Sequence, residues 1–180
     1  VLDIVTLANC ILAGDCVSLD YSCAGDLNGD GGYNVLDIVT LANCVLDGTC
    51  GGRIDDASNA SLIQDENNLF IKGNGFIGGV QMALTHGPDF SIEMTDRALF
   101  ADYLTTGNTT RLLVITPKTD KLFSFKGEFE INELIVANSQ NEIPTLLPEV
   151  YCLSSAYPNP FNPVTTMTLT IPEAGNVNVH

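Results

Sequence analysis

The sequence predicts an α+β fold, with short helices first, an antiparallel β-sandwich in the middle and a C-terminal β segment last. Three observations support this prediction. A helix-patterned segment occurs twice within the first fifty residues, and short runs rich in β-forming residues follow it. Near the end, SSAYPNPFNP places three prolines within six residues, which excludes a helix and favours an extended lead-in to the strand TTMTLTI.

The helical part is an internal repeat of 34 residues. VLDIVTLANCIL at residues 1–12 recurs as VLDIVTLANCVL at residues 35–46. In each copy the apolar residues recur at helical spacing, and a glycine, Gly14 or Gly48, follows where a helix end is expected. We therefore expect two amphipathic helices with the same apolar stripe.

The segment DLNGDGGYNVLD, which leads into the second helix, has the composition of a calcium-binding loop. An EF-hand loop of twelve residues supplies oxygen ligands from positions 1, 3, 5, 7, 9 and 12, and glycine at position 6 allows the sharp turn. Gly31 holds position 6. Such a run can also be an ordinary solvated turn, but here every ligand position is filled and a helix pattern follows. The predicted ligands are Asp26, Asn28, Asp30, the carbonyl of Gly32, Asn34 and Asp37.

Position 12 is Asp37, whereas an ordinary EF-hand has a longer glutamate there. With this aspartate and the helix that follows, the segment resembles a dockerin repeat, and the resemblance covers residues 1–50. It implies calcium-dependent folding and docking to a cohesin. In the first repeat it identifies Asp3 as a last ligand, and we expect that site to be incomplete because its loop would precede Val1.

The usual polar recognition positions of a dockerin, just before the last ligand, are apolar in this chain. They are Val35 and Leu36. The resemblance therefore implies a protein partner without specifying which one.

Six cysteines, five of them in the first fifty residues, favour an oxidising compartment and a secreted protein. Cys10 and Cys16 recur in register as Cys44 and Cys50, which favours one local disulfide in each repeat. Six cysteines permit fifteen pairings, so other connectivities stay open. A zinc site is the weaker interpretation, because no Cys-x-x-Cys doublet occurs.

From residue 57 to 142 the sequence changes to short alternating runs separated by Gly, Asn, Pro and Asp clusters, as in a β-sandwich. The runs include NLFIK, GVQMALTH, FSIEMT, TRLLVIT, KLFSFKG and EFEINELIVAN. Residues 51–56 and 143–150 are the predicted linkers, and residues 151–180 form a partial further domain. The runs from GNGFIGGVQMALTHG onward resemble a cohesin-like module, and an immunoglobulin-like or carbohydrate-binding-like sandwich is the alternative.

The last thirty residues resemble the start of the carboxy-terminal sorting domain of the type IX secretion system. YPNPFNP, the threonine-rich strand and PEAG carry this resemblance. It implies export across an outer membrane, followed by release or attachment at the bacterial cell surface.

The charge of the chain limits its partners. Twenty-two acidic residues against seven basic ones give a formal net charge of −15, which argues against nucleic acid and anionic membrane surfaces. No apolar run approaches the ~18 residues that a membrane-spanning helix needs. The chain begins at Val1 within a helical pattern and ends at His180 within a strand pattern, so we expect it to be a fragment.

We predict no enzyme, because no catalytic constellation stands out. Glu128 and Glu130, with Glu133 nearby, alternate along a predicted strand as a solvated face does. His86 precedes a Gly-Pro turn, which favours a surface histidine over a general base. GNGFIGG lacks the Lys-Ser/Thr pair and the helix of a phosphate-binding loop, so it predicts a bend before a strand.

The sequence therefore predicts a non-catalytic, extracellular, calcium-dependent module for protein–protein interaction or assembly. Because dockerin-like and cohesin-like segments lie in one chain, copies could associate head to tail into a surface filament. The alternatives are the C-terminal tail of a secreted polysaccharide hydrolase, which dockerin-like units commonly accompany, and a carbohydrate-binding module. The absence of tryptophan counts against the last.

Overall fold

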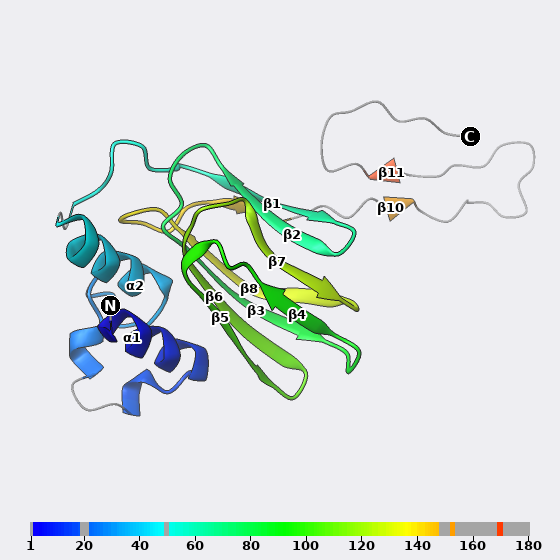
Figure 1. The fold of residues 1–180 in the computed structure, drawn as a ribbon, viewed down its shortest axis with the longest axis horizontal. Helices are drawn as coiled ribbons and strands as arrows, with labels where there is room; N and C mark the ends of the chain where they lie inside the picture. Colours follow the sequence, from blue (N-terminus) through cyan, green and yellow to red (C-terminus); the bar gives the residue numbers. More distant parts are fainter. Residues whose placement is uncertain (1, 19–21, 49–50, 148–151, 154–168, 171–180) are drawn as a thin grey trace, which may run out of the picture. The chain divides into compact units, whose positions relative to one another are not determined.

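The computed structural model of the chain describes residues 2–18, 22–48, 51–147, 152–153 and 169–170. The chain forms two compact units, Val1–Leu146 and Leu147–His180. In the first unit helices precede a β-sandwich (Figure 1), which confirms the predicted α+β class.

In the second unit, β10 (Cys152–Leu153) pairs antiparallel with β11 (Leu169–Thr170). Strand β11 lies within the predicted strand TTMTLTI. The rest of the predicted sorting segment lies outside the described residues.

The repeated segment forms the two α-helices. The helical elements are α1 (Leu2–Ala13), η1 (Cys16–Ser18), η2 (Ser22–Gly25), α2 (Val35–Ala42) and η3 (Asn43–Asp47). Gly14 and Gly48 both have the left-handed backbone that ends a helix, with φ of 70° and 65°. The two copies differ at one point, because η3 is a π-helix whereas the matching residues of the first copy remain α-helical.

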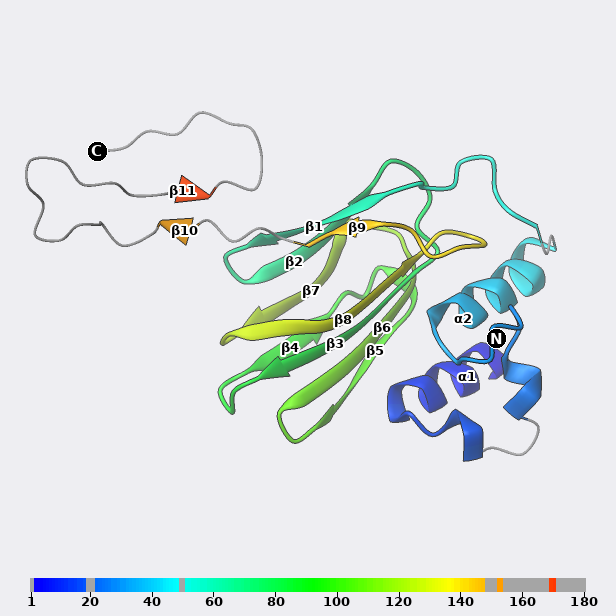
Figure 2. The ribbon, with the colours of Figure 1, turned by 180° about the vertical axis from the view of Figure 1, so that it is seen from behind.

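Nine strands form the two sheets of the sandwich (Figures 1 and 2). One sheet has the order β4-β7-β2-β1-β9 and the other β5-β6-β3-β8. Strand pairs are antiparallel except β1 with β9. The strands are β1 (Ala60–Asp65), β2 (Asn68–Gly73), β3 (Gly79–His86), β4 (Ser91–Met94), β5 (Ala98–Thr106), β6 (Thr109–Pro117), β7 (Lys121–Lys126), β8 (Phe129–Ala137) and β9 (Thr145–Leu146).

The sandwich extends beyond the predicted boundary at residue 142. Ile143 is buried in the core, and Thr145–Leu146 forms β9 beside the start of β1. The predicted linker 143–150 therefore begins with residues of the sandwich.

The core between the sheets is made of aliphatic and phenylalanine side chains. The rings of Phe125 and Phe129 meet edge to face with centroids 4.8 Å apart, and Phe123 packs beside them. The largest fully buried members are Phe123, Leu69, Ile71, Met82, Leu84, Leu112 and Leu122.

A second core joins the helices to the sheet β5-β6-β3-β8, and we call it the helix–sheet core. Strand β6 contributes to both cores, because Leu112 and Val114 face the sandwich interior whereas Leu113 and Ile115 face the helices. Helix α1 contacts β5 and β6, and α2 contacts β3, β6 and β8. Figures 1 and 2 show both helices together beside this sheet. The buried members are Ile4, Leu7, Ala8, Cys10, Ile11, Leu12, Cys16, Val35, Leu36, Ile38, Val39, Ala42, Leu113, Ile115 and Ala137.

The predicted linker 51–56 is anchored to the sandwich by hydrogen bonds. Asp56 Oδ1 accepts from the Ser139 N–H at 3.0 Å, and the Arg53 N–H donates to Ser139 Oγ at 3.0 Å. Asn43, just after α2, donates its amide to the Ser139 carbonyl at 3.1 Å. The guanidinium of Arg53 lies 4.2 Å from the ring centroid of Phe76. These contacts fix both ends of the connection between α2 and the sandwich.

Two glycines at the start of β3 allow α2 to approach the backbone of the sheet. A Cβ atom on Gly78 would lie 2.6 Å from Val39 Cγ1, and one on Gly79 would contact Val35 Cγ2 and lie 2.9 Å from Val39 Cγ2. The segment GNGFIGG, which was predicted to be a bend, thus also provides the surface on which α2 packs.

Replacing Gly79 by alanine should lower the free energy of unfolding by about 1–3 kcal/mol, because the added methyl overfills a packed core. Chemical denaturation measures the loss. Gly87→Ala is the matched control, since nothing lies within 4 Å of a Cβ there. A similar loss in both variants would contradict the close approach of α2.

Candidate metal centre

The predicted calcium loop is closed around its first carboxylate. Asp26 Oδ1 accepts from the N–H groups of Gly29 at 2.8 Å and Asp30 at 3.2 Å, and Oδ2 accepts from Gly31 at 3.0 Å. Gly31 has φ of 86°, which agrees with the positive φ predicted for position 6. The backbone of the loop therefore already turns around Asp26.

Asp37 joins the start of the loop to the helix that follows it. Its side chain accepts from the N–H groups of Leu27 at 2.8 Å and Asn28 at 3.3 Å through Oδ1, and from Asn34 at 3.0 Å through Oδ2. The residue is fully buried. Burial raises the pKa of this carboxyl and the charge of Asp26 adds to the rise, while the three backbone hydrogen bonds oppose it.

Asp30, at position 5, is exposed and bonded within the loop. Its Oδ1 accepts from the Gly32 N–H at 2.7 Å, and its Oδ2 accepts from Asn28 Nδ2 at 2.7 Å. These bonds hold the pKa of Asp30 below its usual value, with the Gly32 N–H as the largest cause. The carboxylate is thus ionised and directed toward neighbouring loop residues.

Asn34, at position 9, caps helix α2. Its Oδ1 accepts from the Leu36 N–H at 2.7 Å, while its own N–H donates to Asp37. The two residues form a capping box, in which the side chain of each accepts a hydrogen bond from the backbone N–H of the other. Two of the predicted ligands therefore also start the helix.

The donor chemistry of the loop fits a hard divalent cation. Every predicted ligand atom is oxygen, and a buried carboxylate is costly without a positive partner. Within the described residues no Lys or Arg forms an ion pair with Asp37. In the same residues, no three side chains of His, Cys, Asp or Glu converge as a metal cluster.

Calcium, when bound, would supply the positive charge that the loop carboxylates lack. The residues that would hold it are Asp26, Asn28, Asp30, Gly32, Asn34 and Asp37. Asp3, the ligand proposed for the first repeat, is exposed in the first turn of α1 and belongs to a different helix.

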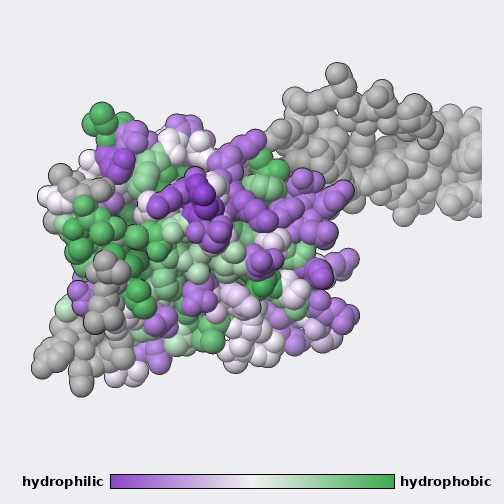
Figure 3. Space-filling model, viewed as in Figure 1, coloured by the Kyte–Doolittle hydropathy of each residue, from purple (hydrophilic) through white to green (hydrophobic). Residues whose placement is uncertain are grey.

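The positions that a dockerin would use for recognition are buried in this chain. Val35 and Leu36 are 0% and 9% exposed, and Val35 packs against Gly79 of the sheet. Val45 and Leu46, by contrast, are 52% and 49% exposed on η3. Figure 3 shows a hydrophobic surface over the helical part of this face and more hydrophilic residues over the strands.

The residues considered for catalysis have structural contacts. His86 is half-buried, with Nε2 2.8 Å from Thr110 Oγ1 and its ring stacked on Phe90 at 4.3 Å. Glu133 Oε1 accepts from Gln81 Nε2 at 3.3 Å, and Glu128 and Glu130 are exposed.

A cavity of about 10 Å³ between α1 and the sheet has room for about one water.

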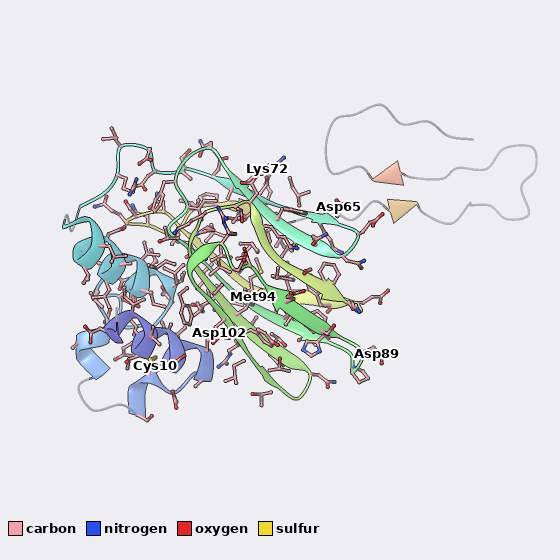
Figure 4. The ribbon with its side chains drawn as sticks, in the orientation of Figure 1. Cys10, Asp65, Lys72, Asp89, Met94 and Asp102 are labelled. Carbon is pink, nitrogen blue, oxygen red and sulfur yellow. A yellow bond between two sulfur atoms is a disulfide. The ribbon has the colours of Figure 1, made fainter. Side chains whose placement is uncertain are left out.

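The predicted disulfide between Cys10 and Cys16 is present, and it ties the end of α1 to η1. Figure 4 labels Cys10 on this helix. Cys44 is also disulfide-bonded, but its predicted partner Cys50 lies outside the described residues.

Sequence reasoning missed Gln81 and Ser139, which contact the helical part from the sandwich. The Val35 N–H donates to Gln81 Oε1 at 3.0 Å, and Ser139 anchors the connection described above. Nothing in their local sequence marks them, because their partners lie far away in the chain. Gln81 stands out only as a polar residue in an apolar strand.

No protein-family model matches the chain, and no curated protein matches it either. Among solved structures, the chain is similar to a non-cellulosomal cohesin from the hyperthermophilic archaeon Archaeoglobus fulgidus. The sequence identity is 11% and the TM-score 0.35, and the match covers 52% of this chain and 83% of that one. No helix among the described residues is long and apolar enough to cross a membrane.

Calcium at about one hundred times its Kd should stabilise the chain by about 2.7 kcal/mol relative to chelator, because it binds only the folded loop. Thermal unfolding in calcium and in chelator measures the difference. Asp26→Ala should remove most of it. Asp65→Ala is the control, since Asp65 lies at the tip of the β1–β2 hairpin away from the helices (Figure 4). A full calcium effect in Asp26→Ala would contradict the site.

Proposed function

We propose that the chain is a non-catalytic, extracellular protein-interaction module that calcium orders. The packing of the loop–helix part on the outer face of the sheet β5-β6-β3-β8 carries this proposal. One chain thus contains a helical binding element and a sheet that accepts it. The complementary shape of Val35, Val39 and the two glycines Gly78 and Gly79 supports a specific contact.

Calcium would act in this module as a fixed structural ion. The loop carboxylate Asp37 also bonds the N-terminal turn of α2, and the next turns of α2 pack on the sheet. A cation on the loop therefore stabilises the element that docks. A calcium sensor needs a helix that moves when calcium binds. In this chain the helix that follows the loop is packed against the sandwich, which favours a structural ion over a sensor.

A further apolar surface remains for a protein partner. Val45 and Leu46 in the second repeat match Ile11 and Leu12 in the first by their repeat position. Ile11 and Leu12 are buried beside the sheet, whereas Val45 and Leu46 are exposed on the π-helix. The stripe residues Val35, Ile38, Val39 and Ala42 of the second copy are buried as well, so Val45 and Leu46 are the apolar residues of this copy that are exposed for a partner.

The contact between helices and sheet would also link copies if it formed between chains. A helical part of one copy on the sheet of the next gives a head-to-tail, open assembly. Within one chain the short connection from Asn43 to Asp56 favours the closed form. Assembly therefore requires this connection to open. The carboxy-terminal resemblance supports delivery to the bacterial cell surface, where such an assembly would act.

Two variants with complementary defects test assembly between chains. Ile11→Asp damages the helical side of the contact, and Ala83→Asp damages the sheet side, since both residues line the same small cavity. Each variant alone should stay monomeric. A mixture should form a one-to-one dimer in calcium, because the first supplies an intact sheet and the second intact helices.

Analytical ultracentrifugation measures these species, with circular dichroism to check that both variants fold. The wild-type chain should assemble with increasing concentration in calcium and dissociate in chelator. A wild-type chain that stays monomeric at high concentration, together with no dimer in the mixture, would restrict the contact to one chain. Matched surface variants Gln64→Asp and Thr85→Asp should leave assembly unchanged.

A further inference from the structure

A hydrogen bond joins the end of the calcium loop to the sandwich. Val35 is the first residue of α2, so its N–H has no carbonyl partner within the helix. It donates to Gln81 Oε1 at 3.0 Å, and Gln81 Nε2 donates to Glu133 Oε1 at 3.3 Å. Gln81 lies on β3 and Glu133 on β8. A short hydrogen-bonded chain therefore runs from the loop across two strands.

Gln81 is a half-buried polar side chain, with the charged Arg111 and Glu133 on one side and apolar residues on the adjacent strands. Its cross-strand neighbours are Leu113 on β6 and Ile135 on β8, and both pack in or against the helix–sheet core. Along β3, Gly79 and Ala83 share its face. An amide in such a place costs free energy unless it is hydrogen-bonded. The Val35 N–H supplies the bond to its oxygen.

The position of Val35 connects this bond to the metal ligands. It lies between Asn34 and Asp37, the predicted ligands at positions 9 and 12. Other donors at this turn, those of Leu36 and Asn34, bond within the loop and helix. The donor of Val35 instead bonds the sandwich. The sheet thus holds the backbone between two ligands.

We propose that Gln81 is a positioning residue for the calcium loop, so that calcium binding and the docking of α2 on the sheet strengthen each other. The inference rests on the proposed calcium function. Because coupling between two binding events is reciprocal, any calcium affinity that docking adds is returned as tighter docking. A glutamine on β3 then controls a metal site that it does not contact.

Gln81→Met tests the proposal, because it keeps an unbranched side chain of similar length and removes the acceptor. Its calcium affinity should be roughly two- to tenfold weaker than that of the wild-type chain, the ratio that one net hydrogen bond corresponds to. Isothermal titration calorimetry of the full chain with calcium chloride measures it. Gln64→Met, at an exposed position on β1, is the matched control and should bind as the wild type does.

A double variant provides the rescue. Gln81→Glu with Glu133→Gln keeps an oxygen for Val35 and restores a donor–acceptor pair between the two strands, with the charge moved from β8 to β3. Its calcium affinity should return to within about twofold of the wild-type value, that is, within about 0.4 kcal/mol. The calcium affinity of Gln81→Glu alone should stay below the wild-type value, because this variant places a second carboxylate beside that of Glu133.

The outcomes separate this proposal from its alternatives. If Gln81→Met binds calcium with wild-type affinity but is less stable in both calcium and chelator, Gln81 has only a structural role and the proposal is overturned. If the wild-type chain itself binds no calcium, the proposed function fails and this inference fails with it.

Hydrogen exchange of the wild-type chain gives a test that needs no variant. The Val35 N–H should exchange more slowly in calcium than in chelator, because calcium would stabilise the docked turn. Equal exchange rates in the two conditions would overturn the coupling, even if every Gln81 variant failed to fold.

Discussion

The first unit depends on covering both faces of strand β6. Leu112, Leu113, Val114 and Ile115 are all fully buried, so neither side of this strand can face water. Burying a side chain of this size stabilises a fold by about 1.5–3 kcal/mol relative to its exposure. The second sheet covers one face and the helices cover the other. Without the helices, the sheet β5-β6-β3-β8 would expose an apolar surface.

This requirement explains several features that look unrelated in the sequence. Gly78 and Gly79 lack side chains where α2 comes closest. Val35 is apolar at the start of α2, where its side chain is inside the protein. The segment from residue 51 to 56 is hydrogen-bonded to Ser139, so the helices and sandwich share one short connection. Each feature favours the packed arrangement over independent domains.

The negative charge of the loop carboxylates affects the packing of α2 on the sheet. Asp37 is buried with only backbone donors around it, while the chain as a whole carries an excess of negative charge. A cation would relieve both the burial cost and the repulsion from Asp26. Calcium would thus act on the same turn that Gln81 holds from the sheet. In this view metal binding and docking are two parts of one stabilising event.

The sequence by itself determined the local structure that short patterns encode. The repeat, its stop glycines Gly14 and Gly48 and the positive φ of Gly31 follow from neighbouring residues. The recurrence of the cysteines favoured the disulfide between Cys10 and Cys16 that the structure shows, but it left other pairings open. Six of the nine sandwich strands were visible as alternating runs, whereas β1, β5 and β9 were not singled out because their patterns are weaker or shorter.

Only the tertiary structure decided which surfaces are covered. Two nearly identical helical repeats are buried differently, because one sheet cannot present the same neighbours to both. The sequence of β6 did not indicate that Leu113 and Ile115 belong to a second core. Nor did the sequence indicate that Gln81 bonds Val35, which precedes it by 46 residues. The periodicity of side chains in the sequence indicates that a face is apolar. What covers that face depends on contacts between distant parts of the chain.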